Sequence, residues 1–182
     1  MVFRQALLQR GQAHFRKGES AAALKDYAAA LEYPANLQVG RPKREPKAAQ
    51  THCLTGQVQA ALHDPTSARE SFERAVARRD RAPSEASFYQ ALALQQLGQA
   101  NEARELFERL VRHGESTRGA AEPADYFAKF GERQSERLRQ AQAYYLLGLG
   151  RLGLGQSAEA TAAFKQALEL HPAHLGALNQ MR

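Results

Sequence analysis

The sequence has one cysteine, seven prolines and no long hydrophobic run among its 182 residues. A single cysteine, Cys53, excludes an internal disulfide. Because no histidine or cation stands at helical spacing from it, we expect a small helix side chain and not a reactive thiol. A membrane-spanning helix needs about 18 consecutive apolar residues, and the N-terminal segment MVFRQALLQRGQ lacks the apolar region of a signal peptide. We therefore expect a cytoplasmic chain with no membrane partner.

Residue clusters that perform catalysis or hold metals are also lacking. His171 and His174 are separated by Pro172 and Ala173 and have no third ligand nearby in sequence, and a zinc site needs three or four ligands. The stretch Gly148–Gly153 satisfies G-x-G-x-x-G, but helical sequence precedes it, whereas a dinucleotide fingerprint follows a strand and opens a helix. No serine lies in a sequence typical of a strained turn that exposes a nucleophile. We therefore expect no enzyme activity, no cofactor and no metal ion.

Positive charge exceeds negative charge, with 25 Lys and Arg against 19 Asp and Glu. Four of the cations and two prolines fall within residues 41–47, which predicts an exposed loop. This loop is either a solvated linker or a basic patch that attracts an acidic partner or a phosphate. Binding of nucleic acid is an alternative for a chain of this charge, although the other basic residues are spread over predicted helix exteriors. The basic-loop residues are Arg41, Lys43, Arg44 and Lys47.

The sequence is rich in Ala, Leu, Arg, Gln and Glu, which favour helices, and it shows no strand pattern. A small residue, a second small residue twelve positions on and an aromatic four beyond that recur four times. Small side chains let the two helices of a hairpin approach closely, and the aromatic is expected to fill the space between successive hairpins. This register predicts an all-α fold of stacked helical hairpins. The four sets are Gly11/Ala23/Tyr27, Gly56/Ala68/Phe72, Ala91/Ala103/Phe107 and Gly148/Ala160/Phe164.

The register resembles the tetratricopeptide repeat (TPR), a unit of about 34 residues with a W-x₂-L-G-x₂-Y…A-x₃-F…P pattern. The last copy matches it best, with Tyr144 at the tryptophan place, then Gly148, Ala160, Phe164 and the closing Pro172. The resemblance implies a right-handed α-solenoid with two insertions and a C-terminal capping helix. The predicted ranges are repeats 4–37, 49–82, 84–117 and 141–174, insertions 38–48 and 118–140, and a capping helix over 172–179, all within a single domain over 1–182.

The second insertion carries three aromatics within residues 126–130, followed by Gly131. Their spacing predicts a short helix that ends at the glycine. From Glu132 no helix breaker follows, so the first helix of the fourth repeat should begin early and end near Gly153. The stretch 125–155 also resembles the C-terminal TPR region of large bacterial proteins that have an N-terminal domain of unknown function. That resemblance implies that the chain is a regulatory or assembly module of a larger protein, for example of a larger enzyme.

TPR proteins bind partners in a concave groove lined by the first helix of each hairpin, so the resemblance implies a scaffold that binds a peptide or protein segment. The groove positions are mostly apolar residues and glutamines, with Arg16 as a nearby cation. Amides can pair with an extended backbone and aromatic rings can pack on side chains, although we expect part of the set to pack within the repeats. The groove-face set is Leu8, Gln12, Phe15, Arg16, Gln50, Gln57, Phe88, Leu92, Gln95, Gln142, Tyr145, Leu149 and Leu152.

Overall fold

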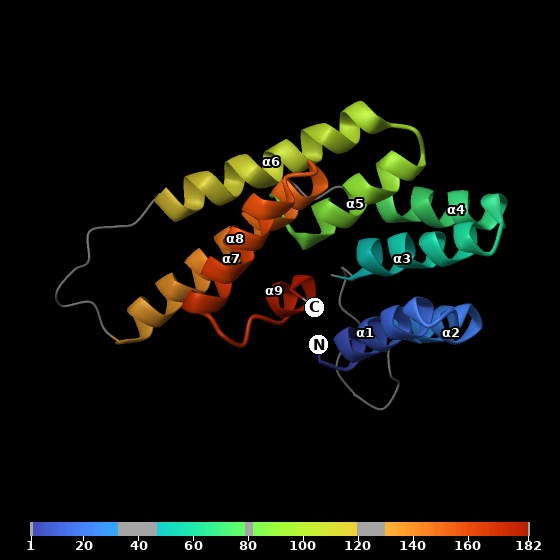
Figure 1. The fold of residues 1–182 in the computed structure, drawn as a ribbon, viewed down its shortest axis with the longest axis horizontal. Coiled ribbons are helices and arrows are strands. Elements are labelled where there is room, and N and C mark those ends of the chain that lie inside the picture. Colours follow the sequence, from blue (N-terminus) through green and yellow to red (C-terminus); the bar gives the residue numbers. More distant parts are fainter. Residues whose placement is uncertain (1, 33–46, 79–81, 120–129, 182) are drawn as a thin grey trace. The chain divides into compact units, whose positions relative to one another are not determined.

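The computed structural model describes residues 2–32, 47–78, 82–119 and 130–181. These residues form α-helices joined by short turns, without a strand among them, and this confirms the predicted all-α fold (Figure 1). Consecutive helices form hairpins, as expected for an α-solenoid. The helices are α1 (Val2–Arg16), α2 (Ser20–Leu31), α3 (Ala48–Ala61), α4 (Pro65–Val76), α5 (Glu85–Gln96), α6 (Ala100–Gly119), α7 (Phe130–Gly153), α8 (Ser157–Leu170) and α9 (Leu175–Gln180).

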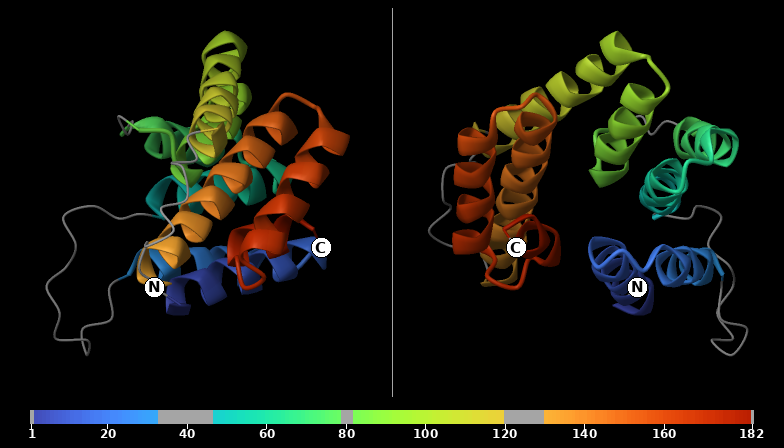
Figure 2. Two further views of the ribbon diagram at one scale, coloured as in Figure 1. Left: turned by 90° about the vertical axis from the view of Figure 1, so that its left-hand side faces the viewer. Right: turned by 45° about the vertical axis from the view of Figure 1, so that its right-hand side comes forward.

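The chain forms two compact units. The N-terminal unit contains residues 1–79 and 92–99, and the C-terminal unit contains residues 80–91 and 100–182. In the N-terminal unit α1 packs against α2 and α3 packs against α4. In the C-terminal unit α7 packs against both α6 and α8, and α8 packs against α9 (Figure 2). A single domain over the whole chain stays a prediction.

The turn inside each hairpin places one residue in the left-handed backbone region. Gly18, Gly98 and Gly155 have φ angles of 80°, 78° and 80°, which glycine adopts without steric cost. His63 takes the same place in the second hairpin with φ 59°, where a β-carbon is unfavourable. The next residue, Asp64, caps α4 by accepting a hydrogen bond from the backbone N–H three residues on. The second hairpin therefore combines a strained turn with a well-capped helix.

The register glycine lies directly against the register aromatic of its own hairpin. A β-carbon added to Gly11 would lie 2.4 Å from Cε1 of Tyr27, and one added to Gly148 would lie 2.4 Å from Cε1 of Phe164. A β-carbon at either position would force the ring to move, so these positions favour glycine. The same glycine–ring contact joins Gly56 to Phe72. The Tyr27 ring also belongs to a core cluster with Leu54 and Val58 of α3, so it fills space between successive hairpins as predicted.

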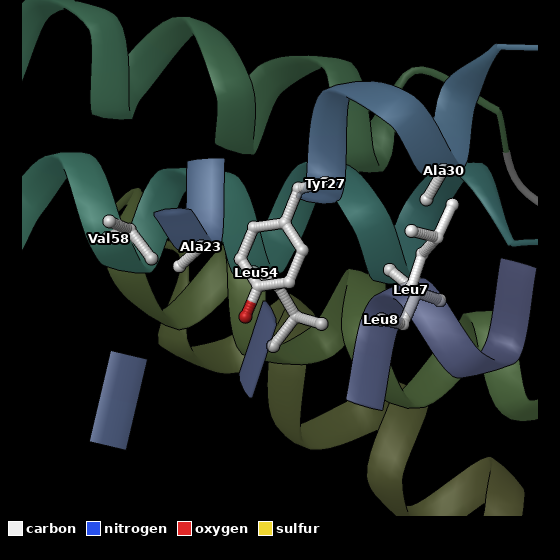
Figure 3. Packing of buried hydrophobic residues seen from close by; sticks show 7 residues of the cluster. All are labelled: Leu7, Leu8, Ala23, Tyr27, Ala30, Leu54 and Val58. Atoms are coloured by element: carbon white, nitrogen blue, oxygen red, sulfur yellow. The ribbon is translucent and has the colours of Figure 1, made fainter. Parts of the chain in front are cut away.

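The core of the N-terminal unit joins the first hairpin to α3. Its leucines, alanines, one valine and one tyrosine come from α1, α2 and α3, and Figure 3 shows the Tyr27 ring among them. Phe15, near the end of α1, is partly buried against this cluster. Burial of these side chains provides the main stabilisation of the unit. The cluster residues are Leu7, Leu8, Ala23, Tyr27, Ala30, Leu54 and Val58.

The Tyr27 hydroxyl is buried and has no hydrogen-bond partner among the residues that the structure describes. Burial raises the pKa of Tyr27 to about 12. We expect Tyr27→Phe to raise the free energy of unfolding by about 1 kcal/mol, because it removes a buried, unsatisfied donor and keeps the ring. The matched control is Phe72→Tyr in the second hairpin, which should lower stability. Urea unfolding followed by circular dichroism measures both, and a loss of stability in Tyr27→Phe would contradict the prediction.

Glycines bring α6 and α7 into close contact in the C-terminal unit. A β-carbon on Gly114 of α6 would lie 2.7 Å from Cβ of Leu147, and one on Gly150 of α7 would lie 2.7 Å from the carbonyl oxygen of Phe107. A β-carbon on Gly153 would lie 2.2 Å from the Phe107 ring. Three glycines from two helices thus form the contact between α6 and α7.

Helix α7 begins at Phe130 and ends at Gly153, which confirms the early start and the predicted end. The predicted stop at Gly131 is wrong, because α7 continues through that residue. The rest of the predicted short helix, residues 126–129, lies outside the described residues.

The C-terminal helix begins later than predicted. It starts at Leu175, three residues after the predicted start, because His174 is the N-cap and its side chain accepts a hydrogen bond from the backbone N–H of Ala177. In the described parts of the chain, no helix has the length and apolarity that crossing a membrane requires.

Candidate functional site

Part of the predicted groove-face set is buried inside its own unit. Leu8 belongs to the core cluster of the N-terminal unit. The ring of Phe88 lies 5.4 Å from the Tyr89 ring and 5.9 Å from the Phe107 ring, measured between centroids. Small residues let the paired helices of a repeat approach closely, so the larger side chains beside the helix–helix contact are buried as well. In this arrangement a partner cannot reach these side chains. The buried members are Leu8, Gln50, Phe88, Tyr145 and Leu149.

The other members of the set remain at least partly accessible. In the N-terminal unit, Gln12 and Phe15 of α1 are half-buried and Arg16 is exposed. Their i, i+3 and i+4 spacing places them on one face of the last turns of α1. The remaining accessible members are Gln57, Leu92, Gln95, Gln142 and Leu152. Of the predicted basic loop, residues 41–46 lie outside the described residues, and Lys47 is the N-cap of α3.

A buried carboxylate links α1 to α2 beside this face. Arg10 donates to both oxygens of Asp26, with distances of 2.8 Å from Nε to Oδ2 and 2.6 Å from Nη2 to Oδ1. Nε2 of His14 lies 3.8 Å from Oδ2 of Asp26, and Nδ1 of His14 contacts the Glu19 carboxylate. The hydrogen bonds from Arg10 lower the pKa of Asp26, while burial acts in the opposite direction. This network fixes the last turns of α1 against α2.

The stability supplied by Asp26 should depend on pH. Its pKa is lower in the folded chain than the value of about 3.9 expected on unfolding, so its contribution is complete above about pH 4 and is lost as the pH falls through the folded pKa. We expect Asp26→Asn to lower the urea midpoint at neutral pH, and the difference from the unmodified chain to shrink in acid. The control Glu73→Gln, in an exposed pair with Arg69, should have little effect. A difference independent of pH would contradict this prediction.

In the C-terminal unit, Tyr145 of α7 is in contact with groups from α5 and from the start of α9. Its hydroxyl donates to Oε1 of Glu85 at 2.9 Å, and its ring centroid lies 4.7 Å from that of His174. Gly176 of α9 lies so close that a β-carbon there would be 2.5 Å from Cζ of Tyr145. Burial and then the Glu85 charge raise the pKa of Tyr145 well above its usual value. Tyr145 is therefore a neutral core residue that holds α5, α7 and α9 together.

The G-x-G-x-x-G stretch lies entirely within α7. Gly148 faces α8 through Phe164, while Gly150 and Gly153 face α6 through Phe107. A dinucleotide fingerprint needs free backbone N–H groups at a helix N-terminus, and this stretch is at the C-terminal end of a helix. Its glycines serve helix packing on two sides.

Cysteine and histidine side chains show no reactive arrangement in the described ranges. Cys53 is buried, and burial raises its pKa to about 12, so its thiol stays protonated. Within those ranges, no three His, Cys, Asp or Glu side chains come together as a metal ion would require. His174 is occupied by hydrogen bonds with Gln142 and with the backbone of Ala177.

Two family models of the tetratricopeptide repeat match this chain, one over residues 53–121 and the other over residues 5–36 and 141–174. Together the matches cover more than half of its length. The chain belongs to the tetratricopeptide repeat family. TPR proteins are generally non-enzymatic scaffolds for protein interactions, so family membership supports a scaffold with protein or peptide partners. The resemblance to the C-terminal region of large bacterial proteins stays a prediction.

Similar solved structures include other TPR chains. MamA is 18% identical, with a TM-score of 0.34, and the match covers 93% of this chain and 78% of MamA. YrrB, a TPR protein with an unusual peptide-binding site, is 19% identical, with a TM-score of 0.37 and coverage of 96% and 90%. The MamA RS-1 ArsTM double mutant is 19% identical, with a TM-score of 0.34 and coverage of 98% and 90%. No curated protein sequence matches significantly.

Sequence analysis predicted a C-terminal capping helix but not its contacts with Tyr145. His174 and Gly176 both contact Tyr145, yet they lie outside the groove-face set. His174 follows the closing Pro172 of the repeat by two positions. This proximity to the last hairpin is the sequence feature that could have indicated its contact with the fourth repeat. Glu85 stands at a groove position of the third repeat, but its bond to Tyr145, 60 residues away in sequence, could not be predicted from the local pattern.

Proposed function

We propose that this TPR chain is a non-enzymatic scaffold that binds a peptide or protein segment on the first-helix face of its repeats. The observation that carries the proposal is the composition of the accessible α1 face. An amide, an aromatic ring and a cation, from Gln12, Phe15 and Arg16, lie at i, i+3 and i+4 and stay partly or fully accessible. The other large side chain of this face, Leu8, is buried.

Each of these side chains offers a different contact. The Gln12 amide can both donate to and accept from the backbone of an extended segment. The exposed part of the Phe15 ring offers an apolar surface, and core packing on its other side keeps it in place. The Arg16 guanidinium can pair with a carboxylate of the partner. The best-fitting partner is therefore a segment that carries an apolar side chain close to an acidic one.

The test compares two charge reversals on the first hairpin. Arg16→Glu changes the proposed face, and Lys25→Glu makes the same change at an exposed position of α2. Each full-length variant is used as bait in an extract of the source cells, and the recovered proteins are quantified by mass spectrometry. We expect Arg16→Glu to reduce recovery of the main partner by about tenfold and Lys25→Glu to leave it unchanged. Equal losses, or no loss in Arg16→Glu, would overturn the proposal.

A further inference from the structure

The first-helix face of the fourth TPR is covered by the end of the same chain. Nε2 of His174 lies 3.1 Å from Oε1 of Gln142, and the His174 ring lies 4.7 Å from the Tyr145 ring. Gly176 lies on the Tyr145 ring with no room for a β-carbon. Gln142 and Tyr145 are both members of the groove-face set. The segment of residues 171–180, here named the α9 segment, therefore occupies positions where an external partner was expected.

The hydrogen bonds of His174 define its protonation state. Its Nδ1 accepts from the backbone N–H of Ala177 at 3.1 Å, so this nitrogen carries no proton. The other nitrogen, Nε2, must then carry the proton and donate it to Gln142. A second proton, bound to Nδ1, would leave the Ala177 N–H without its acceptor. The N–H of Nδ1 and the N–H of Ala177 would then face each other. The docked arrangement thus requires a neutral imidazole.

The charged and titratable groups around His174 come from each segment that packs on it. The His171 ring lies 5.9 Å away, Tyr145 of α7 lies against the imidazole, and Glu85 of α5 holds the Tyr145 hydroxyl. Burial and the neighbouring His171 lower the pKa of His174, while a backbone hydrogen bond and Glu85 act in the opposite direction. The net direction is downward, so the docked imidazole binds a proton less readily than a released one.

We propose that the α9 segment is a built-in occupant of the fourth-repeat face and that protonation of His174 releases it. A released histidine takes up a proton near its usual pKa of about 6.5. Docking is therefore fully favourable above that pH and weakens as the pH falls below it. Release would uncover the Tyr145 ring and free the amide of the exposed Gln142. Binding of a partner to the uncovered face rests on the proposed function. The release of the α9 segment does not.

The test is hydrogen exchange of the α9 amides in the full chain, corrected for the intrinsic effect of pH. Between about pH 7.5 and about pH 5.5, protection of residues 175–180 should fall by about threefold or more, while protection of α8 is retained. His174→Asn keeps a side-chain acceptor at the N-cap and cannot titrate, so its protection should not change with pH. His171→Asn is the matched control: it removes only the smaller of the two causes that lower the pKa of His174, so most of the pH dependence should remain.

Gly176→Leu provides a second, independent variant. Its side chain would collide with Tyr145, so we expect low α9 protection at both pH values with α8 intact. The proposal is overturned if protection in the unmodified chain is independent of pH, if His174→Asn keeps the pH dependence, or if α8 loses protection together with α9. No partner enters this experiment, so its failure can be distinguished from failure of the proposed function.

Discussion

Replacing Gly150 with leucine is expected to lower the free energy of unfolding of the C-terminal unit by about 3 kcal/mol or more. A β-carbon at this position would lie 2.7 Å from the carbonyl oxygen of Phe107 and 2.9 Å from the backbone N of Val111. Backbone atoms inside a helix cannot rotate away as a flexible side chain can. The two helices must therefore separate, and their apolar contact is lost. Urea unfolding followed by circular dichroism measures the loss.

The matched control adds the same side chain where there is space. Ala162 lies on the exposed face of α8, and Ala162→Leu should change stability by no more than about 0.5 kcal/mol. Because leucine is a far better helix former than glycine, an open environment at Gly150 would make Gly150→Leu stabilising. A gain in stability for Gly150→Leu would therefore contradict the described contact between α6 and α7.

Tyr145→Glu should be the second strongly destabilising change, lowering the free energy of unfolding by about 3 kcal/mol or more. Tyr145 is 2% exposed, so the substitution would place an ionised carboxylate in the core. It would also bring that carboxylate next to Glu85, whose Oε1 now accepts the tyrosine hydrogen bond. Repulsion and desolvation act in the same direction. Denaturant unfolding at neutral pH measures the effect.

Tyr145→Phe separates the hydrogen bond from the packing. It keeps the ring between α5, α7 and α9 and removes the bond to Glu85, at an expected loss of about 1 to 2 kcal/mol. If Tyr145 were instead an exposed groove residue, both substitutions would leave stability nearly unchanged. That result would contradict the buried position and return Tyr145 to the accessible part of the groove-face set.

The hairpins could be predicted from the sequence because the register acts locally. Gly11 and Tyr27 are sixteen residues apart, and their contact is repeated in other hairpins at the same spacing. A repeated spacing therefore indicates the geometry of one hairpin. The contact of Gly150 with Phe107 joins different repeats across the second insertion, and no repeated spacing marks it. The sequence thus indicated the need for Gly148 but not for Gly150.

Which members of the groove-face set are buried could not be predicted from their positions in the repeat. Gln142 and Tyr145 lie three residues apart on one helix face, yet Gln142 is exposed and Tyr145 is buried. The difference arises because Gly176 of α9 packs on the Tyr145 ring. The predicted capping helix indicated a neighbour, but its later start, fixed by His174 as N-cap, decides which residues it covers. Burial here depends on a contact between distant segments.

The most direct test of the proposed binding face is position-specific photo-crosslinking. The photoreactive residue p-benzoylphenylalanine replaces Gln12 on the α1 face or, as a control, the exposed Ala28 of α2. Each full-length chain is irradiated in an extract of the source cells, and adducts are identified by mass spectrometry. We predict one main adduct from position 12, lost when Arg16→Glu is added, and none of that partner from position 28. Equal adduct yields from both positions, or no adduct from position 12, would contradict the proposed face.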